Sequence, residues 1–217
     1  MKILLAGDST VAHCPSYEYP MSGWGAELAP LVYQWGAVHN LAKGGASTGS
    51  FRDEGLWGQL LELAGPGDVV LLQFGHNDQK LPHLAAGTGY TANLERMLEE
   101  VHAVGAQAVL CTSVERRNFI AGAQTPTLAD YAQAVRGLSA RRGVPLIDLN
   151  LWTTELYRNA GEAGSIAYFT HLGAGEHAHW PEGLADNTHF SRTGAAAVAG
   201  KVAEALQGLR SQPAQLG

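Results

Sequence analysis

The sequence has few cysteines, few charged residues and no long apolar run. Its two cysteines, Cys14 and Cys111, are too few for a disulfide framework, so we expect two free thiols. Only 16% of the residues are charged, the net charge is −6 at pH 7, and no basic run is present, which excludes the electrostatic pattern of a nucleic-acid-binding protein. No stretch approaches the roughly 20 apolar residues of a membrane-spanning helix. We therefore expect neither nucleic acid nor a membrane as a partner.

The first residues also lack the features of a signal peptide. Their apolar run covers only residues 3–6, and the turn-forming cluster Gly7-Asp8-Ser9-Thr10 follows directly. We therefore expect a cytoplasmic protein, with a mature secreted form as the alternative. The 217 residues, 46% of them hydrophobic, suffice for one domain with a large core. We expect that domain over residues 1–210 and a mobile tail over residues 211–217.

Short apolar runs alternate with segments of helical periodicity along the whole chain. The expected strands cover residues 3–6, 38–42, 69–74, 107–112 and 144–149. The expected helices cover residues 26–34, 51–64, 91–104, 127–142, 151–159 and 193–209, and a long irregular segment covers residues 161–186. The strands are continuously apolar, which indicates a parallel sheet covered on both faces. The predicted fold class is α/β, a three-layer α/β/α flavodoxin-like domain with about five parallel strands.

Three of the predicted strands end in polar clusters, which contain Ser9, Gly44-Gly45 and Asn77. Because ligands bind at the carboxyl edge of a parallel sheet, we expect these residues to lie together. A fourth cluster, Asp186-Asn187-Thr188-His189, precedes the last predicted helix. It joins the other three if the long segment before it folds back over the sheet edge.

The residue types in these clusters suit nucleophilic catalysis. The Ser9 hydroxyl needs a neighbouring base, and the imidazole of His189 is neutral near pH 7 and can accept its proton. Asp186, three residues earlier, is close enough to bind the other ring nitrogen. The backbone amides of Ser9 and Gly45, together with the Asn77 side chain, can stabilise the oxyanion of a tetrahedral intermediate.

In this order, four sequence blocks resemble those of the SGNH (GDSL-type) hydrolases: Gly7-Asp8-Ser9, Gly45, Gly75-His76-Asn77-Asp78 and Asp186-x-x-His189. Two longer runs are similar to the rhamnogalacturonan acetylesterase branch of the carbohydrate esterases: residues 40–45, Asn-Leu-Ala-Lys-Gly-Gly, and residues 74–78, Phe-Gly-His-Asn-Asp. The chain departs from that branch after Gly45, where Ala46-Ser47-Thr48-Gly49 stands in place of an arginine-bearing run.

The resemblance implies roles for five residues of the four blocks. Ser9 is then the nucleophile, His189 the base and Asp186 the acid that orients it, while Ser9, Gly45 and Asn77 donate to the oxyanion. The implied reaction is hydrolysis of an ester through an acyl-enzyme, with no metal and no other cofactor. The expected substrate is an acetylated plant carbohydrate, with a pectin-type oligosaccharide as the example. Two alternatives stay open: another acyl ester, such as a lysophospholipid or short-chain ester, and non-catalytic carbohydrate binding on a hydrolase scaffold.

Two other motifs offer competing sites. The run Gly45-Ala46-Ser47-Thr48-Gly49 fits the G-x-S-x-G nucleophile motif of α/β-hydrolases. The strand before it is weak, and the spacing of Asp186 and His189 is too short for that fold, so we favour Ser9. The segment with His171, Glu176, His177 and His179 contains zinc-ligand types, but no regular element orders them, and we favour a solvated polar lid.

Four further side chains are candidates for substrate contact. Trp24 and Trp180 flank the expected site in the sequence, and aromatic faces suit sugar rings. Arg116 and the adjacent Arg117 follow the fourth predicted strand, where a guanidinium pairs well with a uronate carboxylate. The alternatives are core packing for the tryptophans and solvent exposure for the arginines.

Overall fold

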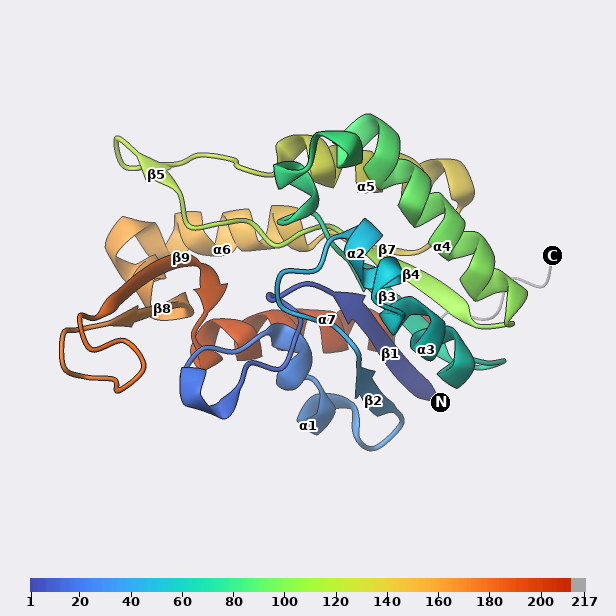
Figure 1. Ribbon diagram of the computed structural model, residues 1–217, viewed down its shortest axis with the longest axis horizontal. Coiled ribbons are helices and arrows are strands. Elements are labelled where there is room, and N and C mark those ends of the chain that lie inside the picture. Colours follow the sequence, from blue (N-terminus) through green and yellow to red (C-terminus); the bar gives the residue numbers. More distant parts are fainter. Residues whose placement is uncertain (212–217) are drawn as a thin grey trace.

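The computed structural model describes residues 1–211, and its centre is a five-stranded parallel sheet (Figure 1). The strands lie in the order β2-β1-β3-β4-β7. Their bounds are Lys2–Gly7 for β1, Ala37–Asn40 for β2, Val69–Gln73 for β3, Gln107–Cys111 for β4 and Leu146–Ile147 for β7. This is the flavodoxin-like order of doubly wound sheets, so the predicted fold class is confirmed.

The central strands are continuously apolar because side chains on both of their faces are buried. All five residues of β3 are buried. Val69 and Leu71 belong to one hydrophobic cluster, whereas Val70 and Leu72 belong to a second. This alternation follows from the two-residue period of a strand, and it places a separate core on each face of the sheet.

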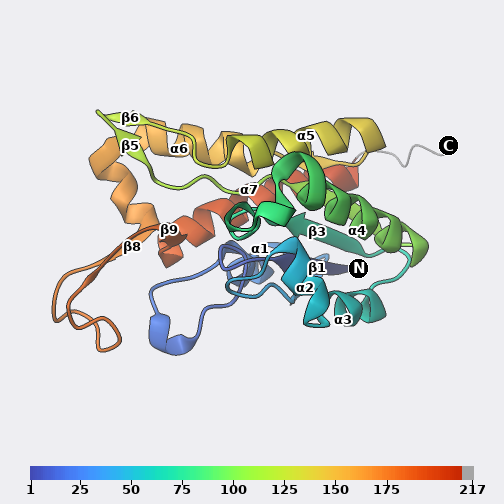
Figure 2. The same ribbon diagram turned by 45° about the horizontal axis from the view of Figure 1, so that its top comes forward.

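Helices on both sides complete the three layers (Figures 1 and 2). One cluster packs the sheet against α1 (Ala29–Val32), α6 (Leu149–Gly164) and α7 (Arg192–Ser211). The other packs it against α2 (Thr48–Asp53), α3 (Leu56–Leu63), α4 (Thr91–Ala103) and α5 (Ala129–Arg142). Helix α4 shows why: its buried residues Leu94, Met97, Leu98 and Val101 recur at helical spacing and form one apolar stripe.

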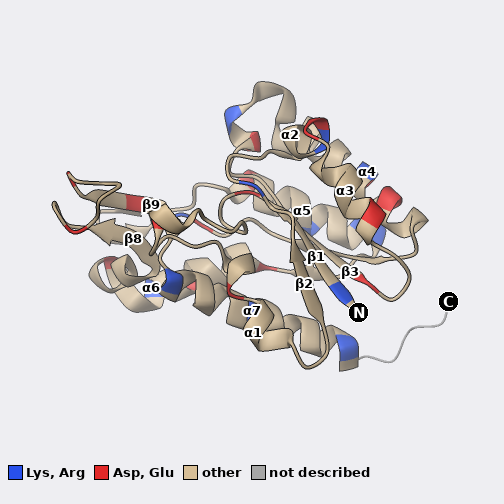
Figure 3. Ribbon diagram, turned by 60° about the horizontal axis from the view of Figure 1, so that its bottom comes forward, with Lys and Arg blue, Asp and Glu red and all other residues tan. Residues whose placement is uncertain are grey.

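Acidic and basic residues are interspersed over the outer helices, as Figure 3 shows. Several form ion pairs between neighbouring helices. Arg52 of α2 donates two hydrogen bonds to Glu100 of α4, at 2.6 and 2.8 Å, and Trp57 Nε1 donates a third at 2.5 Å. A bidentate guanidinium–carboxylate pair of this kind fixes the relative placement of the two helices better than a single contact does.

Three predicted elements are shorter than expected, and each has a local cause. The helix expected over residues 26–34 is reduced to α1, because Pro30 lacks the N–H that a longer helix would donate to Ala26 O, and it lies in the first turn instead. The helix expected over residues 51–64 is divided into α2 and α3 at Gly55, whose φ of +79° ends the first helix. The last strand is short because Asp148, directly after it, caps α6 by accepting from Leu151 N.

The prediction of an irregular segment over residues 161–186 is wrong. Strand β8 (Phe169–Leu172) pairs antiparallel with β9 (Leu184–Phe190), and this strand pair projects at the end of the molecule away from the N-terminus (Figures 1 and 2). Phe169 and Phe190 anchor the pair in the core, a tertiary contact that has no signal in the local periodicity. Asp186 and His189 therefore lie on a strand, and not on a turn before the last helix.

The remaining described segments add no further layer. Strands β5 (Phe119–Ile120) and β6 (Ala123–Gln124) form a short hairpin. None of the helices within residues 1–211 combines the length and apolar character that crossing a bilayer requires. Of the tail expected over residues 211–217, Ser211 ends α7, and residues 212–217 lie outside the described residues.

Two glycines of α7 provide a matched test of how closely this helix packs. A Cβ on Gly194 meets the backbone oxygen of Tyr168 at 2.0 Å, whereas a Cβ on Gly200 meets nothing within 4 Å. We expect Gly194→Ala to lower the free energy of unfolding by about 1–3 kcal/mol, since the backbone oxygen cannot move aside freely. Gly200→Ala should raise it by about 0.5–1 kcal/mol, the ordinary helix preference. Urea unfolding measures both, and equal effects would contradict the close packing.

Candidate active site

The candidate site lies where the strand order of the sheet reverses. From β1 the chain continues to β2 on one side, and from β3 it continues to β4 on the other. Ser9 follows β1, Gly45 follows β2 and Asn77 follows β3, so all three lie at the carboxyl edge beside this reversal. Open α/β sheets bind their ligands at this point because the connecting loops diverge there and leave a crevice.

Strand β9 brings Asp186 and His189 to the same edge, 180 residues from Ser9 in the sequence. His189 Nε2 lies 3.0 Å from Ser9 Oγ, and His189 Nδ1 lies 2.7 Å from Asp186 Oδ2. The other carboxylate oxygen of Asp186 accepts from the backbone N–H groups of Thr188 and His189, at 2.6 and 2.7 Å. The carboxylate is therefore held from both sides, and it orients the imidazole toward the hydroxyl.

The pKa values of this pair are shifted in the directions that such a chain requires. The hydrogen bond to Asp186 raises the pKa of His189 above 6.5 despite partial burial, and the charges of Asp186, Asp8 and Glu18 act in the same direction. Burial alone raises the pKa of Asp186, but its bonds to the side chain and backbone of His189 outweigh this and hold it below its usual value. Asp186 thus stays ionised and stabilises the imidazolium.

Hydrogen-bond donors for an oxyanion surround Ser9. Within residues 1–211, neither the backbone N–H of Ser9 nor that of Gly45 has an acceptor in the chain, and both residues line the same pocket. Gly45 has a φ of +78°, a conformation that favours glycine. Asn77 Nδ2 donates to Ala46 O at 3.0 Å, and Lys80 Nζ donates to Asn77 Oδ1 at 2.9 Å. Asn77 Nδ2 carries two hydrogens, so one of them remains available to a ligand.

A buried carboxylate connects the two loops that carry these donors. Asp78 Oδ1 accepts from the backbone N–H of Thr48 at 2.9 Å and from its hydroxyl at 2.6 Å. Asn93 Nδ2 of α4 donates to the same hydroxyl at 3.0 Å. No role for Asp78, Thr48 or Lys80 was predicted from the sequence. The available signals were the place of Asp78 in the block Gly75-His76-Asn77-Asp78 and the proximity of Lys80 to Asn77 along the chain.

A buried hydrogen-bond chain lies beneath Ser9 and corrects the expectation for Trp24. Asp8 Oδ1 accepts from the backbone N–H and hydroxyl of Thr10, at 2.9 and 2.8 Å. Gln73 donates to the Thr10 hydroxyl at 2.6 Å and accepts from Trp24 Nε1 at 2.7 Å. Trp24 has no exposed surface, so its ring packs in the core and cannot contact a substrate. Its role is to complete this chain of bonds.

The charge of Asp8 belongs to the same buried layer. Its other carboxylate oxygen lies 3.4 Å from His76 Nδ1, and both side chains are almost completely buried. Burial raises the pKa of Asp8, but the facing His76 and the two bonds from Thr10 outweigh this and hold it below its usual value. The buried negative charge therefore lies close beneath the catalytic groups, where it favours the protonated form of His189.

A pocket of about 730 Å³ opens over these groups, a volume within the usual range of small-molecule sites. Ser9, Asn77 and His189 line it on one side. His179 and Trp180, from the loop between β8 and β9, line it on another, and the Tyr17 ring lies 4.9 Å from that of His179. Trp180 is thus placed where the sequence analysis expected a substrate contact, and its contact with substrate stays a prediction.

Arg116 is engaged by the chain itself. Its guanidinium donates to Gln79 Oε1 at 2.6 Å and to Thr127 Oγ1 at 3.2 Å, and it is not among the residues that line the pocket. Its contact with a uronate carboxylate stays a prediction. Arg117 is likewise engaged by the chain itself, through Ser165 and Asn187.

The two competing motifs do not form sites in the structure. Ser47 is 2% exposed and caps α2, accepting from Ser50 N at 3.1 Å within a capping box. In the zinc alternative, Glu176 accepts from Gly173 N, and His177 Nδ1 accepts from His179 N. Within the described part of the chain, no three His, Cys, Asp or Glu side chains form a group that could hold a metal ion.

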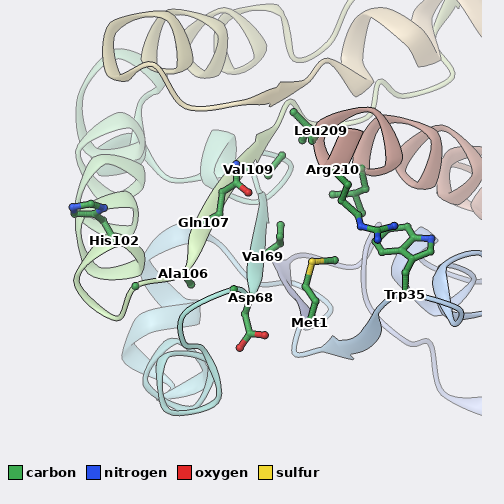
Figure 4. Close-up of a pocket in the computed structure, with 13 residues that line it drawn as sticks. Met1, Trp35, Asp68, Val69, His102, Ala106, Gln107, Val109, Leu209 and Arg210 are labelled. Atoms are coloured by element: carbon green, nitrogen blue, oxygen red, sulfur yellow. The ribbon is translucent and has the colours of Figure 1, made fainter. Parts of the chain in front are cut away.

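A second cavity, of about 380 Å³, lies at the opposite edge of the sheet (Figure 4). Met1, Asp68 and Gln107 line it near the beginnings of β1, β3 and β4, together with residues of α7. The guanidinium of Arg210 lies 4.3 Å from the centre of the Trp35 ring. None of the predicted site residues borders this cavity, so it is separate from the candidate active site.

Comparison with known proteins agrees with this geometry. The chain matches the GDSL-like lipase/acylhydrolase family over residues 5–197. It is 40% identical to the rhamnogalacturonan acetylesterase RhgT of Bacillus subtilis (strain 168) over 96% of this chain and 90% of that protein. It is 31% identical to the probable rhamnogalacturonan acetylesterase YesY of the same organism over 95% and 93%. The crystal structure of Bacillus subtilis YxiM superposes with a TM-score of 0.82 at 25% identity, covering 97% of this chain and 57% of YxiM.

The fold and these matches define an esterase with the architecture of the SGNH hydrolases. The chain belongs to the GDSL-like lipase/acylhydrolase family. The family that the four sequence blocks indicated is therefore confirmed. The roles of Ser9, Asp186 and His189 stay predictions, and two experiments test them.

The first prediction separates the two candidate nucleophiles. Ser9→Ala should reduce the hydrolysis of p-nitrophenyl acetate to background, because no other hydroxyl within residues 1–211 bonds His189. Ser47→Ala should keep the activity and lower the free energy of unfolding by about 1 kcal/mol, the usual effect of losing a helix cap. Loss of activity in the Ser47 variant alone, with the Ser9 variant active, would refute the assignment.

The second prediction concerns pH. Activity should fall as the pH drops through the pKa of His189, because the protonated imidazole cannot accept the Ser9 proton. The bond to Asp186 raises that pKa. The acid limb, which is the fall of kcat/KM on the acidic side of the pH profile, should therefore be centred above pH 6.5. Asp186→Asn should move the limb to lower pH and reduce kcat by about 10³- to 10⁴-fold. A limb that stays in place in this variant would show that another group controls it.

Proposed function

We propose that this chain removes O-acetyl groups from a carbohydrate through an acetyl-enzyme on Ser9. A plant oligosaccharide of rhamnogalacturonan or pectin type is the substrate class we favour. The observation that carries the proposal is the hydrogen-bonded chain Ser9–His189–Asp186, which faces a pocket bordered by Gly45 and Asn77. The 40% identity to a protein named rhamnogalacturonan acetylesterase supports the substrate class.

In the proposed first half-reaction, His189 Nε2 takes the proton of Ser9 while Oγ attacks the acetyl carbon. The carbonyl oxygen becomes an oxyanion, which accepts hydrogen bonds from the N–H groups of Ser9 and Gly45 and from the Asn77 amide. The intermediate collapses when His189 gives the proton to the departing sugar oxygen. Each such oxyanion donor contributes about 3–4 kcal/mol to stabilising the transition state.

In the second half-reaction, a water molecule takes the place of the sugar. His189 removes one of its protons, the resulting hydroxyl attacks the acetyl carbon, and Ser9 leaves with the proton returned by His189. Acetate is released, and the enzyme regains its starting state. Asp186 keeps its charge throughout and stabilises the imidazolium in both halves. These steps use only groups of the chain, the ester and water.

The walls of the pocket support a polar and cyclic substrate over a long acyl chain. Lys43, Lys80 and Glu18 place charges around it, and Trp180 adds an aromatic face. Aromatic faces suit the apolar side of a sugar ring, whereas charged walls are poor partners for a fatty acyl chain. A small acetyl group also needs no extended apolar groove.

Acetate release from a panel of esters tests the proposal. We expect acetylated pectin fragments to be the best substrates, above acetylated xylan, xylooligosaccharides and a lysophospholipid, with Ser9→Ala as the blank. Preference for the lysophospholipid would overturn the substrate class and keep the chemistry. Binding of the oligosaccharide without turnover of any ester, p-nitrophenyl acetate included, would overturn the enzymatic proposal in favour of a carbohydrate-binding protein.

A further inference from the structure

We propose that Arg116 and Arg117 are positioning residues that hold the two halves of the catalytic site in register. Arg116 fixes the loop that carries Asn77, and Arg117 fixes strand β9, which carries Asp186 and His189. The inference rests on the serine mechanism proposed above, and it assigns a role to two adjacent cations that do not line the catalytic pocket.

Arg117 binds the catalytic strand by its backbone and by its side chain. Its backbone N–H donates to Asn187 O at 2.9 Å, and its NH1 group donates to Asn187 Oδ1 at 3.0 Å. Asn187 is the residue directly after Asp186. The same Oδ1 atom lies 3.0 Å from His171 Nε2 of β8. Asn187 is therefore held by contacts from both Arg117 and the neighbouring strand.

The remaining donors of Arg117 connect this strand to the body of the domain. Its Nε donates to Ser165 Oγ at 3.0 Å, and its NH2 group donates to Glu162 O at 2.6 Å, both at the end of α6. The Phe119 ring lies 5.5 Å from the guanidinium carbon. Every nitrogen of the side chain therefore has a partner. This use of a planar fork is beyond the reach of a lysine ammonium.

Strand β9 needs such a tether because it is not part of the central sheet. It pairs only with β8 within the described residues, and the register between them shifts between Phe169 and His171. An irregular two-stranded pair is a weak frame for an imidazole that must stay within hydrogen-bond distance of Ser9. The buried Phe190, whose carbonyl accepts from Ser22 N at 3.0 Å, anchors the end of β9 next to His189, and the bonds from Arg117 hold the strand beside Asp186.

Arg116 makes the corresponding contacts on the other half of the site. Its NH2 group lies 3.4 Å from His76 O, the carbonyl that precedes Asn77, and its NH1 group donates to Gln79 Oε1 at 2.6 Å. Both partners lie in the loop that carries Asn77. The two adjacent arginines thus reach in different directions, one to the oxyanion side and one to the base side.

The segment that presents both arginines is itself firmly held. Glu115 is 1% exposed, and its carboxylate accepts from the backbone N–H of Arg116 at 2.9 Å, from that of Thr127 at 3.1 Å and from Asn150 Nδ2 at 3.2 Å. Its own N–H donates to Thr153 Oγ1 at 2.9 Å. Glu115 thereby fixes this segment to α6 and to the residues before α5, so the arginines project from a rigid base.

Charge-preserving variants test the proposal. Arg117→Lys and Arg116→Lys should each lower kcat for p-nitrophenyl acetate by about 10-fold while KM changes little. The reason is that the catalytic groups lose their alignment, whereas the residues that bind the ester are unchanged. The acid limb should move to lower pH in Arg117→Lys only, since that variant loosens the Asp186–His189 bond that raises the pKa of His189. Arg142→Lys is the matched control, since Arg142 bonds Glu99 on the outer helices and should keep full activity.

A second variant covers the case in which an arginine variant folds poorly. Asn187→Ala alters an exposed residue and removes the acceptor that both Arg117 and His171 use. We expect it to lower kcat and to move the acid limb in the same direction as Arg117→Lys, with an unchanged melting temperature.

Two results would overturn the inference. One is a kcat within about twofold of the unaltered protein in both Arg117→Lys and Asn187→Ala, with the acid limb unmoved. The other is a loss of activity that disappears when each rate is divided by the fraction of molecules that are folded. The variants would then be less stable, as a lower melting temperature would show, but not less active. If the unaltered protein shows no Ser9-dependent esterase activity, the serine mechanism fails instead, and that outcome is distinct from both.

Discussion

The rest of the structure depends on one hydrogen bond, the 3.0 Å contact between Ser9 Oγ and His189 Nε2. It joins the end of the first strand to a strand near the end of the chain. In the proposed mechanism the sheet supplies the nucleophile and the oxyanion donors, whereas the β8–β9 pair supplies the base and its acid. Neither half then has the complete chemistry. The contacts of Asp78 join the two oxyanion loops, and Arg117, next to the segment that Glu115 holds, bonds the strand that carries the base.

Much of this arrangement is visible in the sequence because its signals are local. The apolar run of β3 indicates a strand buried on both faces, and the polar residues after β1 and β3 indicate the functional edge. Asp186 and His189 are only three residues apart, so their side chains can form a hydrogen bond whether the segment is a turn or a strand. The contact between Asp186 and His189 could therefore be predicted even though the secondary structure around His189 was not.

The errors arise where tertiary contacts decide the outcome. Tryptophan suits both a sugar face and a core, and only the bond from Trp24 to Gln73 in the folded chain selects the core. An arginine can bind the carboxylate of a ligand, or it can connect segments of its own chain. Arg116 bonds the carbonyl of His76 and the side chain of Gln79, and only the folded chain reveals these contacts. Strand β9 is formed by long-range pairing and by the burial of Phe190, which no local pattern records.

The 180-residue separation of Ser9 and His189 has a consequence for how the protein forms during translation. The imidazole is synthesised late, and helix α7 follows it directly in the sequence. Phe190 and the buried side chains of α7 belong to the hydrophobic cluster on one face of the sheet. A nascent chain that ends before β9 therefore lacks both the proposed base and part of this core, so the proposed activity and the finished fold arise together.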